Sequence, residues 1–488
     1  MRFGFQHTYA ALPERFYLQV QPTRVADPQL VAFNGDLAAE LGLDAAAIRP
    51  QAAAIFSGNA LPEDARPIAM AYAGHQFGAF VPRLGDGRAI LLGELRDRAG
   101  ILRDVQLKGS GLTPFSRSAD GRAALGPMLR EYLVSEAMHA LGIATTRSLA
   151  VVTTGERVFR EEALPGAVLT RVAASHVRVG TFQYFAARGD VDGVRALLQY
   201  VIERHYPEAR ESDTPALWVL EAVARRQAAL VAGWMLVGFI HGVMNTDNMT
   251  LSGETIDYGP CAFMDEYDPK TVFSSIDHNG RYAYANQAVI AQWNLARLAE
   301  TLLPLIDADQ DRAVERATQV IEPFIREFDA RILEGMRRKL GIAGALAQDA
   351  ELIRRLLGHM QAAHADFTLT FRDLASAAGE TAAAAAVRAR LGGTPGIDTW
   401  LADWQRRLEH EPQPAAQRAA TMRAANPAFI PRNHRVQAAL DAAERGDLAP
   451  FFRLLAVLKR PYEEQPEAAE YSTPPEPAER VLQTFCGT

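Results

Sequence analysis

The segment 241–260, HGVMNTDNMTLSGETIDYGP, constrains the fold more than any other stretch, because it places acidic and amide side chains directly behind a long apolar segment. Asp247 and Asn248 are adjacent, and Asp257 follows later in the segment as part of an Asp-Tyr-Gly sequence. Such oxygen ligands suit Mg²⁺, which takes one or two carboxylates from a protein and completes its shell with water and phosphates. A polar turn between two core elements explains the same residues, since Asn and Asp bond their own backbone in turns.

Size and charge exclude several classes of protein. The 488 residues suffice for one large catalytic fold with a helical extension or for several domains. The net charge is only −7 and no long run of Lys or Arg occurs, which argues against nucleic-acid and membrane-surface binding. The apolar run 228–244 is shorter than the roughly 20 residues that cross a bilayer. The N-terminus has no apolar core of signal-peptide length, so we expect a cytoplasmic protein.

A glycine-rich stretch with strand-forming residues covers 68–95. Asp86 and Gly87 separate two apolar runs, which is typical of a tight β-hairpin because its turn needs positive φ. In such a hairpin, Gly85 and Gly87 would let backbone amides approach a phosphate. An ordinary hairpin explains these glycines equally well.

A lysine and a glutamate follow on a predicted strand and helix. In 104–108, DVQLK, alternation puts the apolar residues on one face and Lys108 on the other. Residues 126–141 have apolar side chains at helical spacing, and Glu131 lies on their side of the helix. A buried carboxylate needs a cation, and Lys108 is the obvious candidate. A solvated strand lysine and an exposed helical glutamate remain alternatives.

Two arginines close the N-terminal half. Residues 148–172 have a strand-like composition, and Arg171 and Arg178 lie on either side of a turn of small residues. The planar guanidinium fork suits phosphate, although pairing with surface carboxylates is the commoner use of arginine.

The order of these parts is that of a protein kinase: glycine hairpin, strand lysine, helix glutamate, apolar helix, Asp/Asn loop and Asp-Tyr-Gly. In kinases the lysine and glutamate pair, while an Asn and the Asp of Asp-Phe-Gly hold the metals. Each part alone is weak, but together they favour an ATP-using site. We predict an α+β, protein-kinase-like bilobal fold with a large C-terminal helical extension.

The corresponding domain prediction has five parts. Residues 1–65 form an N-terminal extension, 66–180 a nucleotide-binding lobe and 181–290 a catalytic lobe. Helical composition dominates 291–460, and the Pro- and Glu-rich tail 461–488 is predicted to be flexible.

One position departs from the kinase pattern. When HGVMNTDN is aligned with the kinase signature H-R-D-L-x-x-x-N, Val243 stands where the kinase has its catalytic Asp. An apolar side chain cannot accept a hydroxyl proton, and such general-base help is worth about 10² to 10⁴ in rate. Either catalysis has been lost, or Asp247 accepts a proton for a differently placed nucleotide.

Several longer motifs resemble those of the selenoprotein O/YdiU family. They include YAGHQFG, LGDGR, LKGSGLTPFSR, DGRA, HGVMNTDNM with DYGP, and NPAFIPRN, and together they span nearly the whole chain. The resemblance implies a pseudokinase fold that binds ATP in inverted orientation and transfers AMP to Ser, Thr or Tyr hydroxyls of proteins. It also implies a second reaction for some members, UMP transfer from UTP with Mn²⁺.

The resemblance implies roles for individual residues. Those implied to contact the nucleotide are Gly85, Gly87, Arg88, Asp120 and Gly121. Those implied to hold phosphate are Lys108, which pairs with Glu131, together with Arg171 and Arg178. Asp247 is implied to be the proton acceptor, and Mg²⁺ is assigned to Asn248 and Asp257.

Two cysteines exclude a disulfide framework and a zinc site of paired thiolates. Cys486 stands where the resemblance implies a C-terminal Cys or selenocysteine, and Cys261 is the only other cysteine with which it could pair within the chain. A redox role stays open because the distance between their Cα atoms does not follow from sequence. Two rival functions also stay open: a kinase that transfers the γ-phosphate, and an inactive nucleotide-binding scaffold.

Overall fold

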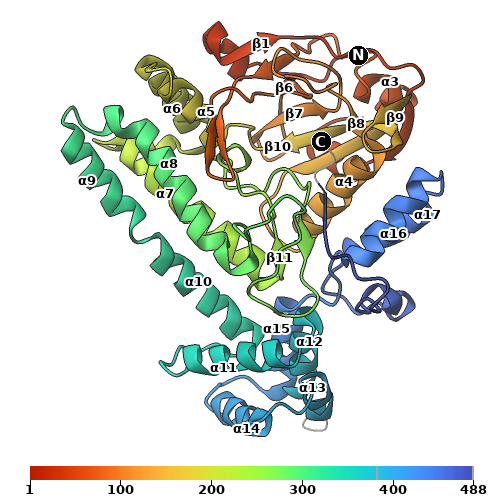
Figure 1. The fold of residues 1–488 in the computed structure, drawn as a ribbon, viewed down its shortest axis with the longest axis vertical. Helices are drawn as coiled ribbons and strands as arrows, with labels where there is room; N and C mark the ends of the chain where they lie inside the picture. The colour runs from red at the N-terminus through yellow and green to blue at the C-terminus, as the bar shows by residue number, and fades with distance from the viewer. Residues whose placement is uncertain (381–382, 486–488) are drawn as a thin grey trace.

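The structure is a computed structural model that describes residues 1–380 and 383–485. It is mixed α/β, with antiparallel sheets in the N-terminal part and a helical C-terminal region (Figure 1). The predicted α+β class and the helical C-terminal extension are confirmed at this level. Within the described ranges, no helix has both the length and the hydrophobicity that a membrane span requires.

The main sheet of the described residues has eight strands in the order β1-β3-β6-β7-β10-β9-β2, with β8 paired to β10. Neighbouring strands run antiparallel. Their bounds are β1 Tyr17–Gln19, β2 Gln29–Phe33, β3 Ile68–Met70, β6 Ala89–Arg96, β7 Leu102–Lys108, β8 Ala123–Ala124, β9 Arg147–Phe159 and β10 Ala163–Ala173. Two small sheets pair β4 (Gly74–Gln76) with β5 (Ala79–Val81), and β11 (Phe239–Ile240) with β12 (Ala262–Phe263).

Helices cover both faces of the main sheet. One face packs on α1 (Gly35–Glu40), α2 (Ala45–Ile48) and α3 (Ala52–Phe56), and the other on α4 (Leu125–Ala140), α16 (Asn433–Glu444) and α17 (Ala449–Leu458). The predicted alternation of the lysine strand is confirmed. Val105 and Leu107 of β7 point into the apolar packing between the sheet and the helices α1–α3, whereas Lys108 points towards α4. A single strand therefore joins a hydrophobic core to a charged site.

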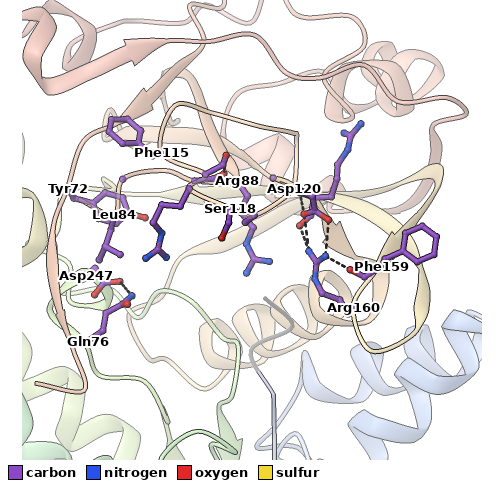
Figure 2. A pocket seen from close by; sticks show the side chains of 17 residues that line it. Tyr72, Gln76, Leu84, Arg88, Phe115, Ser118, Asp120, Phe159, Arg160 and Asp247 are labelled. Carbon is purple, nitrogen blue, oxygen red and sulfur yellow. Dashed lines mark hydrogen bonds and ion pairs between the residues drawn. The ribbon is translucent and has the colours of Figure 1, made fainter. Parts of the chain in front are cut away.

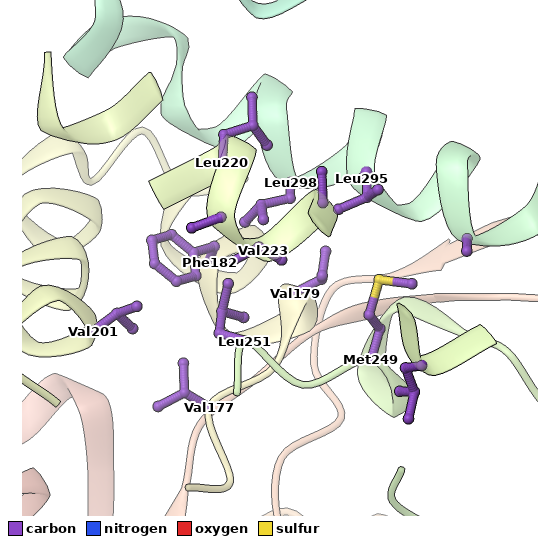
Figure 3. Close-up of a cluster of buried hydrophobic side chains, with 14 of the residues drawn as sticks. Val177, Val179, Phe182, Val201, Leu220, Val223, Met249, Leu251, Leu295 and Leu298 are labelled. Carbon is purple, nitrogen blue, oxygen red and sulfur yellow. The ribbon is translucent and has the colours of Figure 1, made fainter. Parts of the chain in front are cut away.

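A second core lies beneath the Asp/Asn segment. It is built by α5 (Val179–Ala186), α6 (Val191–His205), α7 (Pro215–Leu236), α8 (Gln287–Ile306) and α9 (Gln310–Ile321). Figure 3 shows Met249 and Leu251, which follow the Asp/Asn pair, among side chains from α5, α7 and α8 such as Phe182 and Leu295. Both anchoring side chains are at most 5% exposed. Burial of these residues fixes one end of the candidate site to the helical core.

A third core occupies the helical extension. Its helices are α10 (Phe324–Lys339), α11 (Asp349–Ala362), α12 (Phe367–Ala377), α13 (Ala384–Arg390), α14 (Ile397–Leu408) and α15 (Ala415–Ala425). Trp400 and Trp404 stack at a centroid distance of 5.9 Å, and each indole N–H donates to a backbone carbonyl. Lys339 is 3% exposed, with its ammonium 4.1 Å from the centre of the Phe371 ring.

The predicted hairpin at Asp86-Gly87 is wrong. The hairpin turn of this region lies at Phe77 and Gly78, both with positive φ, between β4 and β5. Asp86 instead lies in the connection to β6, which pairs with β3 and β7. Its buried Oδ2 accepts hydrogen bonds from the Met70 amide (3.1 Å) and from a glutamine of β7, so the side chain is drawn into the sheet rather than exposed at a turn.

The tail also differs from the sequence-based expectation over 461–485. A 3₁₀ helix, Pro466–Tyr471, packs near α17, and Gln465 is buried with its amide donating to the Val457 carbonyl. Thr484 is 4% exposed and its hydroxyl donates to the Pro260 carbonyl oxygen at 2.6 Å. Composition favoured disorder, but these polar anchors fix the backbone.

Replacing Lys339 tests the burial of a charge in the third core. Burial lowers the pKa of Lys339 to about 7, so between pH 7 and its unfolded value near 10.5 the unfolded chain binds more protons. Stability should therefore rise with pH in that window, by up to about 1.4 kcal/mol per pH unit. Lys339→Met should remove this rise and increase stability at pH 7, measured by denaturant unfolding at several pH values. A pH slope equal in both proteins would contradict a buried, neutral Lys339.

Candidate active site

A 3₁₀ turn, Thr246–Asn248, carries the adjacent Asp and Asn. Asn245 fixes its start, because the side-chain oxygen accepts hydrogen bonds from the Phe77 amide (3.0 Å) and the Tyr282 hydroxyl (2.6 Å). The hydroxyl of the following threonine accepts from the His75 amide at 2.7 Å. Contacts from two separate segments, the β4–β5 hairpin and the loop at Tyr282, thus hold the turn.

The carboxylate of Asp247 is buried and makes few hydrogen bonds. Its Oδ2 accepts a long hydrogen bond, 3.4 Å, from Gln76, whereas Oδ1 has no hydrogen-bond partner (Figure 2). A Cβ at Gly74 would lie 2.6 Å from Oδ1, so this glycine makes room for the carboxylate. Burial raises the pKa of Asp247 to about 6, against the opposing effect of Arg178. A carboxylate with these properties is suited to accept a proton near neutral pH.

The side chain of Val243 is buried, and its backbone supports Asn248. Val243 is 5% exposed, and its carbonyl oxygen accepts a hydrogen bond from Asn248 Nδ2 at 3.1 Å. With its amide nitrogen engaged, Asn248 offers its side-chain oxygen to any further ligand.

A buried ion cluster lies at the second aspartate. Lys108 Nζ is 2.7 Å from Glu131 Oε2 and 2.8 Å from Asp257 Oδ1. Arg171 Nη2 is 2.5 Å from Glu131 Oε1 and 4.0 Å from Asp257 Oδ1. The predicted pairing of Lys108 with Glu131 is therefore present. We call these four residues the ion cluster.

Asp257 is the member of the ion cluster that faces outward. Its side chain is 21% exposed, against 8% or less for the other three. Its backbone has a φ of +67°, which is uncommon outside glycine. Burial opposes ionisation, but Lys108 and Arg171 outweigh it and hold the pKa of Asp257 far below its usual value. Asp257 is therefore ionised at neutral pH.

Arg178 joins the Asp247 turn to the sheet. Its Nη1 donates to the backbone carbonyl of Asp247 at 2.8 Å, and its guanidinium lies 4.5 Å from the centre of the Tyr72 ring. Nη2 is 3.9 Å from Asp86 Oδ1, an oxygen without a hydrogen-bond partner. Burial raises the pKa of Asp86 to about 6, although Arg178 opposes this.

A cavity of about 480 Å³ opens beside Asp247 (Figure 2). Six sequence-predicted residues line it: Gly85, Gly87, Arg88, Asp120, Gly121 and Asp247. Lining residues without a predicted role are Tyr72, Gln76, Leu84, Phe115, Ser116, Arg117, Ser118, Ala119, Arg122, Phe159 and Arg160. Most of these residues lie in the loop after β7 or at the tip of the β9–β10 hairpin.

Packing accounts for part of this lining. A Cβ on Gly85 would lie 2.3 Å from the Phe115 ring, and one on Gly121 would lie 2.3 Å from the Gly111 backbone. Asp120 is paired with Arg160 at 2.8 Å across the cavity wall. These glycines are required by close approach of the chain itself, whether or not a ligand binds.

Comparisons with known proteins identify the family. The family model described as "Protein adenylyltransferase SelO" matches residues 1–459. The chain belongs to the SelO family. Proteins named "Protein nucleotidyltransferase YdiU" match over the full chain: that of Rhizobium etli (strain CIAT 652) is 63% identical over 487 residues, covering 100% of this chain and 97% of the relative. That of Rhizobium meliloti (strain 1021) is 62% identical, covering 100% and 99%, and that of Rhodopseudomonas palustris (strain BisB5) is 60% identical, covering 100% of both.

Membership of the SelO family accounts for the motifs that the sequence resemblance rested on. Tyr72 and Gln76 belong to the YAGHQFG motif, and Phe115 belongs to LKGSGLTPFSR. The motifs were therefore a signal for these missed residues. Phe159 and Arg160 lie outside the quoted motifs, and only the fold brings their hairpin to the cavity.

The residues assigned to a metal fit a hard cation in their chemistry. Asn248 has a side-chain oxygen to offer, and Asp257 is a partly exposed carboxylate that stays ionised. The described residues contain no group of three or more His, Cys, Asp or Glu side chains that could hold a metal. Two protein oxygens with phosphates and water are a usual set for Mg²⁺ and not for zinc.

Cys261 is buried, and burial raises the pKa of its thiol to about 11. Cys486 lies outside the described residues, so the pairing considered from sequence stays a hypothesis.

Lys108→Met should weaken ATP binding about 10- to 100-fold, because a buried charge-assisted contact is worth roughly 1.5–3 kcal/mol. In this variant Arg171 stays beside both Glu131 (2.5 Å) and Asp257 (4.0 Å), so neither carboxylate is left without a cation and the fold should persist. Calorimetric titration with ATP measures the effect. Lys459→Met, which removes an exposed ion pair with Asp36, is the matched control and should bind ATP like the wild type. Equal affinity in both variants would exclude Lys108 from the nucleotide site.

Proposed function

We propose that this chain is a protein adenylyltransferase that transfers AMP from ATP to Ser, Thr or Tyr hydroxyls of protein substrates and releases pyrophosphate. The family match over 1–459 supports this activity. The observation that carries the mechanism is the Asp247 carboxylate, which lines the cavity of about 480 Å³ with one oxygen that has no hydrogen-bond partner. Val243, which the sequence alignment pairs with the kinase base, is buried.

The proposed architecture is a protein-kinase-like bilobal fold. Residues 66–180 form the nucleotide-binding lobe and 181–290 the catalytic lobe, with 1–65 as an N-terminal extension, 291–460 as the helical extension and 461–488 as the tail. The contact between Lys108 and Glu131 supports this division, because a strand lysine paired with a helix glutamate is the arrangement of kinase nucleotide-binding lobes.

ATP is proposed to lie inverted relative to a kinase. The cavity then receives the adenosine, with aromatic surface from Phe115 and backbone contacts at the glycine positions. The nucleotide contacts are assigned to Gly85, Gly87, Arg88, Asp120 and Gly121. Arg171 and Arg178 grip the terminal phosphates, and Lys108 holds an inner phosphate. The three cations lie around the two aspartates, which supports a phosphate site on that side of Asp247.

Asn248 and Asp257 are the residues that would hold Mg²⁺, or Mn²⁺ if UTP replaces ATP and UMP is transferred. When bound, the cation would neutralise charge on the phosphates of the nucleotide.

The chemical step follows from the remaining residues. Asp247 accepts the proton of the acceptor hydroxyl, whose oxygen attacks the α-phosphorus. The bond from the α-phosphorus to the oxygen that bridges to the β-phosphate breaks, and pyrophosphate leaves. Lys108, Arg171 and Arg178 stabilise the leaving charge, since such transfers depend mainly on positioning and electrostatics.

ATP labelled separately at the α- and γ-phosphates tests the reaction. Label from the α-phosphate should appear on an acceptor protein, and label from the γ-phosphate should appear only in pyrophosphate. Transfer of the γ-label to protein would establish the rival kinase reaction. Transfer of neither label in the presence of Mg²⁺ or Mn²⁺ would support the inactive scaffold.

Asp247→Asn should lower kcat about 10²- to 10⁴-fold, the usual contribution of a general base. ATP affinity should stay near that of the wild type, because the substitution keeps the backbone carbonyl that holds Arg178. Steady-state adenylylation and calorimetric ATP binding separate these quantities. A variant with wild-type kcat would exclude Asp247 as the proton acceptor.

A further inference from the structure

A second cavity lies next to the Asp247 turn and has no role in the reaction described above. It measures about 560 Å³, and its lining residues are Phe77, 276–279, Arg281, Asn286, Val289 and Ile290. Ile276 and Val289 on its rim are 52% and 59% exposed. We call it the hairpin groove. Exposed apolar side chains gathered around a concavity are typical of an interaction site.

The hairpin groove and the nucleotide cavity share the β4–β5 hairpin. Gln76 lines the nucleotide cavity and donates to Asp247, whereas the next residue, Phe77, lines the groove. Their Cα atoms are about 3.8 Å apart, as for any neighbouring residues. A peptide segment bound in the groove therefore has residues close to Asp247, the proposed proton acceptor.

The hairpin is held in an unfavourable conformation at this junction. Phe77 has a φ of +51°, a region that bulky residues seldom occupy. Its amide donates to Asn245, and its ring lies 5.1 Å from the Tyr282 ring. Strained residues persist where surrounding contacts enforce them, and they gather at binding and catalytic sites. Here the contacts place an aromatic ring in the groove wall.

The far wall of the groove carries Asp277 and Arg281. Asp277 is 5% exposed, and its two carboxylate oxygens accept hydrogen bonds from the backbone amides of Arg281 (2.9 Å) and Tyr282 (2.8 Å), so both oxygens are engaged within the loop. The Arg281 guanidinium lies 4.9 Å from the Trp293 ring, and it has no ion pair with a carboxylate of the described residues. The groove thus combines an apolar rim with an arginine that has no ion-pair partner among the described residues.

We propose that the hairpin groove binds the acceptor segment of the protein substrate: an extended stretch with a large apolar side chain and an acidic residue within a few positions of the modified hydroxyl. The inference rests on the proposed adenylyltransferase activity. The apolar side chain packs between Phe77, Ile276 and Val289, and the acidic one pairs with Arg281. An extended chain advances about 3.3 Å per residue, so a short segment can enter both the groove and the neighbouring nucleotide cavity.

The test uses synthetic peptides that each contain one Ser, Thr or Tyr as the acceptor. Near the acceptor, one position carries either Leu or Lys and a second position carries either Asp or Lys, and both positions are moved along the peptide. The enzymes are the wild type, Ile276→Glu and Val289→Glu, with Ile101→Glu and Val314→Glu as controls at similarly exposed apolar sites (50% and 45%) away from the groove. The wild type should prefer peptides with Leu and Asp. Both groove variants should raise KM for these peptides about tenfold or more, the worth of one buried apolar side chain. ATP affinity and the controls should not change.

Arg281→Glu gives a second measurement. This variant should prefer Lys-containing peptides over Asp-containing ones, the reverse of the wild type, and an unfolded protein would show no such reversal. Unchanged KM values in both groove variants, or transfer by the wild type to proteins but to none of the peptides, would overturn the groove assignment. Absence of AMP transfer by the wild type to any acceptor would refute the proposed function itself.

Discussion

The ion cluster of Lys108, Glu131, Arg171 and Asp257 is the interaction on which the rest of the site depends. It joins β7, α4 and β10 to the segment that carries Asp257, and three of its four side chains are almost fully buried. Charges in such surroundings are tolerated only when they are paired, and removal of one partner is far more costly than the pair is worth. The cluster therefore fixes how the sheet and the Asp257 segment meet.

The two aspartates have opposite electrostatic environments. Asp257 has two cations nearby and stays ionised, whereas Asp247 has an unused oxygen and a pKa raised to about 6 by burial. The charge of Asp257 also raises the pKa of Asp247. Two carboxylates whose environments separate their pKa values in this way are suited to different tasks, one to bind a cation and one to accept a proton.

Local patterns predicted much of this arrangement. Alternation in β7 and helical spacing in α4 brought Lys108 and Glu131 to facing surfaces, and the Val243 departure directed attention to Asp247. The hairpin at Asp86-Gly87 was not correct, because burial of the Asp86 side chain in the sheet decides the path there and its partners are distant in sequence. The positive φ of Phe77 depends on Asn245, and the Phe159 wall on a hairpin that only the fold brings near. Such long-range contacts leave no local periodicity in a single sequence.

A crystal structure with an ATP analogue that carries a methylene between the α- and β-phosphorus atoms tests the central claim most directly. We expect the α-phosphorus to lie closest to the Asp247 carboxylate, with the terminal phosphate at Arg171 and Arg178 and the adenosine in the cavity of about 480 Å³. A terminal phosphate next to Asp247, with the adenine base on the side of the two arginines, would contradict it.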